Sequence, residues 1–216
     1  MGTIRRLVLK NFKRFKTLEL EFDPELNILV GGNEAGKSSV LQAMDIVLSA
    51  SRSKVEGIGL EALFNADCIA EFLAGGRKVA DLPELLIEVY LDGLQGRHDL
   101  DGRNNSKRAD HLGIKLVCGP ADEFTLEIQS ILAEGHDNFP FEYYGIRFET
   151  FTDDTLFPHK KPLRHLLIDS SQINNKYASF RTINPETRNK LYVACSRARG
   201  KLTFVPESLL KAYRLT

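Results

Sequence analysis

The residues with the clearest chemical potential are the eight from Gly31 to Ser38, which read Gly-Gly-Asn-Glu-Ala-Gly-Lys-Ser. Gly31, four further residues and then Gly36-Lys37-Ser38 match the spacing of the Walker A phosphate loop. Glycines let successive backbone N–H groups turn toward one point, where they can donate to the oxygens of a phosphate chain. The motif therefore predicts a site for a nucleoside triphosphate, which we expect to be ATP.

Each residue type in the motif has a task in phosphate chemistry. We expect Lys37 to reach the β and γ phosphates, and Ser38 to give its hydroxyl to Mg²⁺, which neutralises charge on the transferred phosphoryl group. The rest of the predicted nucleotide contact comes from the loop and the residue after it, namely Gly31, Gly32, Glu34, Ala35, Gly36 and Ser39. The alternative is a glycine turn before an ordinary helix.

The segments on either side of the loop favour the phosphate-binding interpretation. Leu26 to Val30 is a short apolar run typical of a buried strand. From Ser38 onward, apolar residues recur at helical spacing, at Val40, Leu41, Ala43, Met44, Val47 and Leu48. Strand, glycine loop and helix thus follow one another in the order that a phosphate loop requires.

The remaining elements predict an α/β fold, with a mixed sheet around the phosphate-loop helix and an antiparallel N-terminal edge. The alternating runs Ile4 to Leu9 and Leu18 to Phe22 predict an antiparallel strand pair at that edge. Further along the chain we expect a helix over 60–73, strands over 85–91, 114–118, 143–151 and 163–169, a helix over 123–132, and an exposed loop over 93–110. We place a boundary near Asn175, which separates a lobe of residues 1–175 from a basic segment of residues 176–216 packed on the same domain.

The first fifty residues resemble the opening of an ABC-type ATPase head of the SMC, RecF and OLD group. The resemblance rests on three runs: Leu9 to Phe15, reading Leu-Lys-Asn-Phe-Lys-Arg-Phe; Leu26 to Asn33; and Gly36 to Ala43. A looser similarity up to about Asn175 is to the OLD-type ATPases associated with DNA processing and phage defence. The resemblance implies a P-loop NTPase of the ABC-head type.

The same resemblance implies roles for residues that the motif alone does not specify. Asn33 would lie beside the triphosphate, and Lys13 and Arg14 would lie near the nucleotide. Gln172, which follows the expected strand Leu163 to Asp169, corresponds to a glutamine that contacts Mg²⁺ and the attacking water. A polar loop residue is an equally good interpretation of Gln172.

A rival interpretation takes residues 166–169 as a Walker B strand, with Asp169 on the metal. We rank it lower, because Ser170 occupies the position of the family's catalytic glutamate.

Several features of these families are missing from the sequence. We find no signature motif of the Leu-Ser-Gly-Gly type, no Asp-Glu pair closing an apolar strand, no heptad segment for a coiled-coil arm, and no acidic cluster of the Toprim nuclease type. A second lobe is not recognisable. We therefore expect the chain to need a homodimer or a partner subunit that supplies a signature motif.

Basic residues are concentrated at both ends of a chain whose formal net charge is zero. Residues 1–16 carry six lysines and arginines without an acid, and residues 176–216 carry nine against two glutamates. Within the second segment, Asn189 to Leu202 weakly resembles the last motif of UvrD-type helicases, in which an arginine reaches the γ phosphate. Arg197 or Arg199 could serve that role, or the segment could contact DNA, or it could simply end the sheet.

Composition narrows the class of protein further. No apolar run approaches the roughly 20 residues of a membrane helix, the N-terminus lacks the pattern of a signal peptide, and three widely spaced cysteines suggest reduced thiols. We expect a cytoplasmic protein without a membrane association. Its expected function is that of an ATP-binding, potentially ATP-hydrolysing head that acts in DNA processing, repair or phage defence, with DNA or a DNA-processing partner. The alternative is a non-catalytic module that holds ATP to dock a partner protein.

Overall fold

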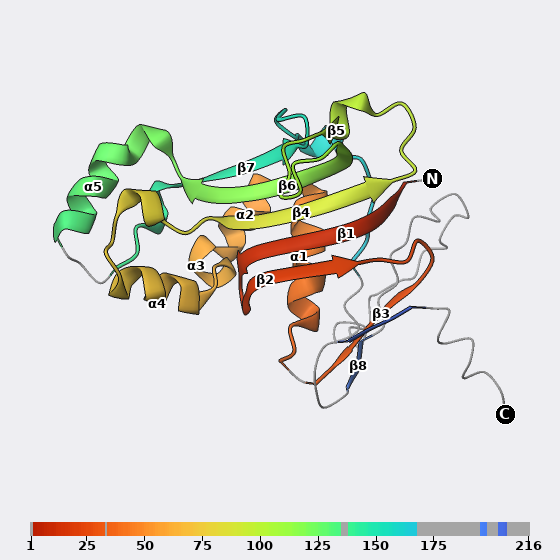
Figure 1. The fold of residues 1–216 in the computed structure, drawn as a ribbon, viewed down its shortest axis with the longest axis horizontal. Coiled ribbons are helices and arrows are strands. Elements are labelled where there is room, and N and C mark those ends of the chain that lie inside the picture. The colour runs from red at the N-terminus through yellow and green to blue at the C-terminus, as the bar shows by residue number, and fades with distance from the viewer. Residues whose placement is uncertain (1, 33, 135–137, 168–194, 198–202, 207–216) are drawn as a thin grey trace, which may run out of the picture.

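A computed structural model describes residues 2–32, 34–134, 138–167, 195–197 and 203–206 (Figure 1). Its strands are β1 (Thr3–Phe12), β2 (Phe15–Glu21), β3 (Asn27–Gly31), β4 (Leu85–Asp92), β5 (Asp101–Gly102), β6 (His111–Pro120), β7 (Tyr144–Thr150), β8 (Cys195–Arg197) and β9 (Thr203–Pro206). Its α-helices are α1 (Lys37–Ser49), α2 (Arg52–Ile58), α3 (Leu60–Leu63), α4 (Ala66–Ala74) and α5 (Thr125–Glu134). Short 3₁₀ turns occupy Val79–Asp81, His98–Leu100, Asp122–Phe124, Phe141–Tyr143 and Pro158–Lys160.

The larger sheet is antiparallel and has six strands in the order β2-β1-β4-β6-β5, with β7 also paired to β6. The predicted N-terminal strand pair is confirmed, because Leu7 lies opposite Leu20 and Leu9 opposite Leu18. The pair forms one edge of the sheet, as expected, since β2 is the outermost strand. β1 then joins this edge to the centre through its antiparallel pairing with β4.

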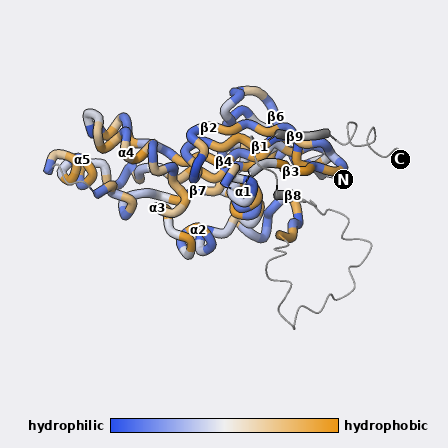
Figure 2. Tube along the Cα trace, turned by 90° about the horizontal axis from the view of Figure 1, so that it is seen from below, coloured by the Kyte–Doolittle hydropathy of each residue, from blue (hydrophilic) through white to orange (hydrophobic). Residues whose placement is uncertain are grey.

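One face of this sheet buries the phosphate-loop helix. Leu7 and Leu9 of β1 share the core with Ile87 and Val89 of β4 and with the apolar side of α1, whose buried residues are Val40, Ala43, Met44, Ile46, Val47 and Leu48. Figure 2, turned by 90° from Figure 1, shows α1 and α2 on one side of the strands. The 3.6-residue period of the apolar positions therefore gives α1 a stripe that the alternating strand residues can cover.

The opposite face carries a small apolar cluster of Val8, Tyr90 and Phe151, and beside it buried polar groups that hold down the loop that follows β4. Glu88 is buried and accepts hydrogen bonds from the backbone N–H of Ser106 at 2.9 Å and from its hydroxyl at 2.5 Å. Lys115 is also buried, and its ammonium donates to Asn104 Oδ1 at 2.7 Å. Because buried charges need such partners, the predicted loop over 93–110 is fastened to the sheet at these points.

β3 belongs to a separate three-stranded sheet, in which it lies between a parallel β8 and an antiparallel β9. The expected strand over 26–30 is thus confirmed, but it does not extend the first sheet. A closed turn precedes β3, in which Asn27 accepts a hydrogen bond from the N–H of Asp23 and donates one to the carbonyl of Asp23.

The helix expected over 60–73 is two helices, α3 and α4, which are separated by Phe64 and Asn65. Asn65 has an extended backbone, and its side chain accepts a hydrogen bond from the N–H of Cys68, so it starts a new helix. The preceding helix α2 was not expected. Ser51 caps its N-terminus in the same way.

The buried strand expected over 163–169 is wrong for its described part, since residues 163–167 form no strand. Leu166 is 60% exposed and Leu167 is 45% exposed. Only Leu163 of the three leucines is buried. The segment is held by a side chain rather than by a strand ladder, because His165 Nε2 lies 2.9 Å from Asp45 Oδ1.

Asp45 of α1 joins three segments of the chain. Its other carboxylate oxygen, Oδ2, accepts a hydrogen bond from the Lys54 ammonium of α2 at 2.5 Å. Burial alone would raise the pKa of Asp45, but the hydrogen bonds from Lys54 and His165 outweigh burial and hold this pKa below its usual value. The ionised carboxylate is therefore the form that the folded chain stabilises.

The lowered pKa of Asp45 predicts a pH dependence of stability. A carboxyl whose pKa is lower in the folded state stabilises the fold above its unfolded pKa of about 3.9, and this contribution is lost as the pH falls through the folded pKa. Asp45→Asn should lower the free energy of unfolding by about 1–3 kcal/mol at pH 7, a deficit that shrinks below pH 4. Urea denaturation at pH 7 and pH 3.5 measures both values.

The exposed aspartate Asp101, changed to Asn, serves as the control for this experiment. If Asp45→Asn lowers the free energy of unfolding equally at pH 7 and pH 3.5, the lowered pKa of Asp45 is contradicted.

No helix in the described part of the chain is long and apolar enough to cross a membrane.

Candidate nucleotide site

The phosphate loop connects the last residue of β3, Gly31, to the first residue of α1, Lys37. Gly36 caps the helix in the left-handed region at φ 93°, and Glu34 is also left-handed at φ 68°. Within the loop, the N–H of Ala35 donates to the carbonyl of Gly32 at 3.2 Å. This alternation of backbone conformations is the kind that brings N–H groups together into an anion-binding concavity.

Lys37 folds back over the loop. Its ammonium donates to the carbonyls of Gly31 and Gly32, each at 2.6 Å. The ammonium has three N–H donors, so these two bonds fix its position and leave donor capacity for a further acceptor. The cation thus lies at the loop and beside the N-terminus of α1, whose first turn carries no acidic residue.

The two serines of the motif lie in the first turn of α1. Ser38 is exposed and Ser39 is half-buried. The Ser38 hydroxyl is an oxygen ligand of the kind that Mg²⁺ takes from a protein, and its exposure leaves room for phosphate and water oxygens to complete the coordination. No group of three or more His, Cys, Asp or Glu side chains that could hold a metal occurs among the residues that the structure describes.

The tip of the β1–β2 hairpin packs directly on the phosphate loop. A Cβ atom at Gly36 would clash with the Phe15 ring and would lie 2.7 Å from Arg14 Cδ. The structure therefore places Arg14 beside the phosphate loop, where we expect the nucleotide to bind. Lys13 precedes it in the turn, and its backbone bonds to Leu63 and Asn65 rather than to the loop.

Two residues that support the loop, Phe15 by direct contact and Asn65 through Lys13, were not expected from the sequence. Phe15 reads as an ordinary position of an alternating strand, and only the folded hairpin brings its ring to Gly36. Asn65 had a local signal, because an asparagine just before an apolar helix is a typical N-terminal cap. Its contact with Lys13 has no such signal.

Several expected site residues lie outside the described residues, namely Asn33, Asp169, Gln172 and Arg199. The boundary placed near Asn175 lies outside them as well. The backbone of Arg197 is described, and the parallel pairing of β8 with β3 sets it in register with Gly31. Ligands of α/β proteins commonly bind at the carboxyl ends of parallel strands.

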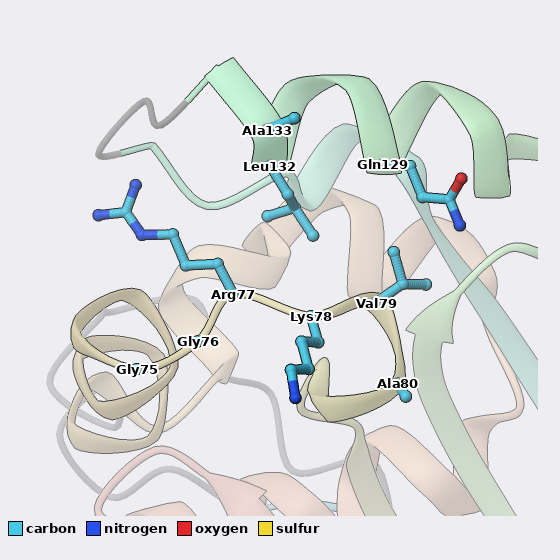
Figure 3. A pocket seen from close by; sticks show the side chains of 9 residues that line it. All are labelled: Gly75, Gly76, Arg77, Lys78, Val79, Ala80, Gln129, Leu132 and Ala133. Atoms are coloured by element: carbon cyan, nitrogen blue, oxygen red, sulfur yellow. The ribbon is translucent and has the colours of Figure 1, made fainter.

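Two hollows elsewhere on the surface contain no residue of the phosphate loop. One, of about 800 Å³, lies between residues 75–80 and α5 and is lined by Val79, Leu132 and their neighbours (Figure 3). The other, of about 720 Å³, covers the polar face of the larger sheet around Glu88 and Lys115. The charged groups of the second hollow include those that fasten the 93–110 loop.

Comparison with known proteins finds a family match that spans the phosphate loop. Residues 3–74 match the family described as the AAA ATPase domain. The "DNA replication and repair protein RecF" of Synechococcus sp. (strain JA-2-3B'a(2-13)) is 29% identical over 110 residues, which are 51% of this chain and 28% of the relative. The "Structural maintenance of chromosomes protein 6" of Saccharomyces cerevisiae is 38% identical over 68 residues, which are 31% of this chain and 6% of the relative.

The chain therefore spans less than a third of the length of either relative. Among solved structures, the Smc head domain with an extended coiled coil, bound to the C-terminal domain of ScpA and derived from Pyrococcus furiosus, is 22% identical. That comparison covers 62% of this chain and 33% of the other, with a TM-score of 0.35, which is too low to carry an argument. The family match and the two relatives support an ATPase head segment of the RecF and SMC type in the N-terminal part of this chain, with a P-loop NTPase fold.

The close packing at Gly36 predicts a strong response to a single methyl group. Gly36→Ala adds a Cβ in a left-handed conformation and against the Phe15 ring, so the free energy of unfolding should fall by about 1–3 kcal/mol. Urea denaturation of the purified chain measures this loss.

The matched control for this experiment is Gly57→Ala in α2, where a Cβ would find no atom within 4 Å. It should leave the stability unchanged or raise it by up to about 1 kcal/mol. Equal stabilities of the two variants would contradict the close packing.

Proposed function

We propose that this chain binds ATP with Mg²⁺ at the phosphate loop and forms part of an ATPase head that acts on DNA or with a DNA-processing partner. The observation that carries the proposal is the position of the Lys37 ammonium, held by two loop carbonyls at the N-terminus of α1. A cation, a helix N-terminus and a glycine loop all favour a chain of phosphates at the same point.

In this proposal, each of the described site residues makes a different contact with the nucleotide or with Mg²⁺. Backbone N–H groups of the loop donate to the phosphates, and Lys37 neutralises the β and γ phosphates as a point charge. Ser38 would hold Mg²⁺, which supplies charge neutralisation on the phosphoryl oxygens when it is bound. Arg14 is placed to add a second positive charge from the hairpin tip.

The names of the two relatives support a role with DNA, since one is a DNA replication and repair protein and the other a structural maintenance of chromosomes protein. Both ends of this chain are basic, which suits contact with a phosphate backbone. A narrower role in DNA processing or phage defence, of the OLD type, is our hypothesis from the sequence.

Catalysis is proposed to depend on a second subunit. The sequence lacks a signature motif of the Leu-Ser-Gly-Gly type, which ABC-type heads receive from an opposing subunit. Gln172 is the proposed group that orients water and contacts Mg²⁺. The rival proposal is a binding module that holds ATP to dock a partner, and it predicts ATP affinity without turnover under any condition.

Lys37→Ala tests the binding site. Loss of a charge-assisted contact worth about 1.5–3 kcal/mol should weaken ATP binding by roughly 10- to 150-fold. Isothermal titration calorimetry measures the affinity, and circular dichroism confirms that the variant is folded. The exposed Lys78, which lines the hollow of Figure 3, provides Lys78→Ala as the matched control with unchanged affinity. Equal ATP affinity of Lys37→Ala and the parent would show that the site has been misassigned.

Turnover tests the need for a second subunit. ATP hydrolysis by the isolated chain should stay close to background, with or without DNA, where calorimetry shows clear binding. A coupled phosphate-release assay across a range of protein concentrations measures it. A rate per molecule that is robust and independent of concentration would contradict the incomplete site, whereas a rate that rises with concentration would support dimer-dependent catalysis.

A further inference from the structure

Asn65 is a buried polar residue between α3 and α4, with only 2% of its surface exposed. Its Oδ1 accepts a hydrogen bond from the N–H of Cys68 at 2.9 Å, and its Nδ2 donates one to the carbonyl of Lys13 at 2.6 Å. The first partner can only donate and the second can only accept, so these contacts fix which way the amide points. One side chain thus joins the start of α4 to the β1–β2 hairpin.

Main-chain bonds reinforce the same junction. The N–H of Lys13 donates to the carbonyl of Leu63 at 2.7 Å, and the N–H of Asn65 donates to the carbonyl of Asn11 at 2.9 Å. Phe12 and Phe64 form a β-bridge beside them. The end of β1 and the start of the turn are therefore bound to the α3–α4 junction through Asn11, Phe12 and both backbone groups of Lys13.

The turn needs this external support. Its two residues between the strands are Lys13 and Arg14, and it contains no glycine. Asn11 and Lys13 both have left-handed backbones, at φ 51° and φ 49°. Such conformations of residues other than glycine persist where the surrounding structure holds them, and they are common at functional sites.

The tip that Asn65 holds is the one that contacts the phosphate loop. Arg14 and Phe15 pack on Gly36, one residue before Lys37. A continuous series of contacts therefore runs from the start of α4 through Asn65 and the Lys13 carbonyl to the loop.

We propose that Asn65 is a positioning residue of the nucleotide site, which holds the Lys13–Phe15 tip at the distance from the phosphate loop that ATP binding requires. This inference rests on the proposed function, since it names a residue that acts on the same site. Asn65 acts through Arg14 and Phe15. Its helix-capping bond to Cys68 is a separate, structural contribution.

Asn65→Asp separates the two contributions. Aspartate keeps an oxygen for the N–H of Cys68 and is itself a favoured helix cap, but it cannot donate to the Lys13 carbonyl. We expect ATP affinity to fall three- to tenfold. The melting temperature should fall as well, because the buried carboxylate faces the Lys13 carbonyl without a donor. Asn65→Ser, which keeps a shorter capping oxygen that cannot span to Lys13, should give the same loss and covers the case in which the aspartate variant does not fold.

Ser51→Ala is the matched control, because Ser51 caps α2 through the N–H of Lys54 and has no contact with the hairpin among its described bonds. It should lower the melting temperature without changing ATP affinity. An equal loss of ATP affinity in Ser51→Ala would show that general destabilisation, and not the hairpin, explains the Asn65 variants.

A double variant tests whether Asn65 acts through the tip. If it does, Asn65→Asp combined with Arg14→Ala should bind ATP within about twofold of Arg14→Ala alone, because contacts in one network are not additive. If the double variant instead loses ATP affinity by the product of the two single-variant losses, the inference is overturned. Full ATP affinity in both Asn65 variants would overturn it while leaving the proposed function intact, and absence of ATP binding by the parent chain would overturn both.

Discussion

The nucleotide site depends on one close contact, in which a hairpin tip rests on a glycine that has no side chain. Gly36 must be left-handed to begin α1, and it must lack a Cβ for the Phe15 ring to approach. Both requirements fall on the same residue. The start of α1 is therefore packed directly against the tip of the hairpin formed by the first two strands.

Local patterns were sufficient for β1, β2, β4, β6, β7 and α1, but not for β5, which lies in the segment expected as a loop over 93–110. The alternation in β1 and the apolar spacing of α1 report directly on the face that each element buries. The expected helix over 60–73 failed because Phe64 maintains the apolar pattern, whereas Asn65 has an extended backbone and caps a new helix. The expected strand over 163–169 failed because its leucines suggest burial, whereas Leu166 and Leu167 are exposed and the segment is held by a hydrogen bond between His165 and Asp45.

The site itself was predictable to the extent that it is contiguous in sequence. A fixed spacing from Gly31 to Ser38 specifies a loop conformation, and the position of Lys37 over the loop follows from it. The support around the loop is not contiguous. Asn65 contacts Lys13, and Phe15 contacts Gly36, only because the hairpin, α4 and α1 come together in the fold. No local sequence pattern predicts contacts between residues so far apart in the chain.

The pairing of β1 with β4 has a consequence for the order in which the chain can assemble during synthesis. β2 follows β1 at once. The other neighbour of β1 is β4, which is not complete until residue 92 has been synthesised. The helix that follows the phosphate loop is made long before then, and its apolar residues, such as Val40 and Val47, lack their cover. The nascent chain therefore passes through an interval in which this segment is exposed to chaperones and to aggregation.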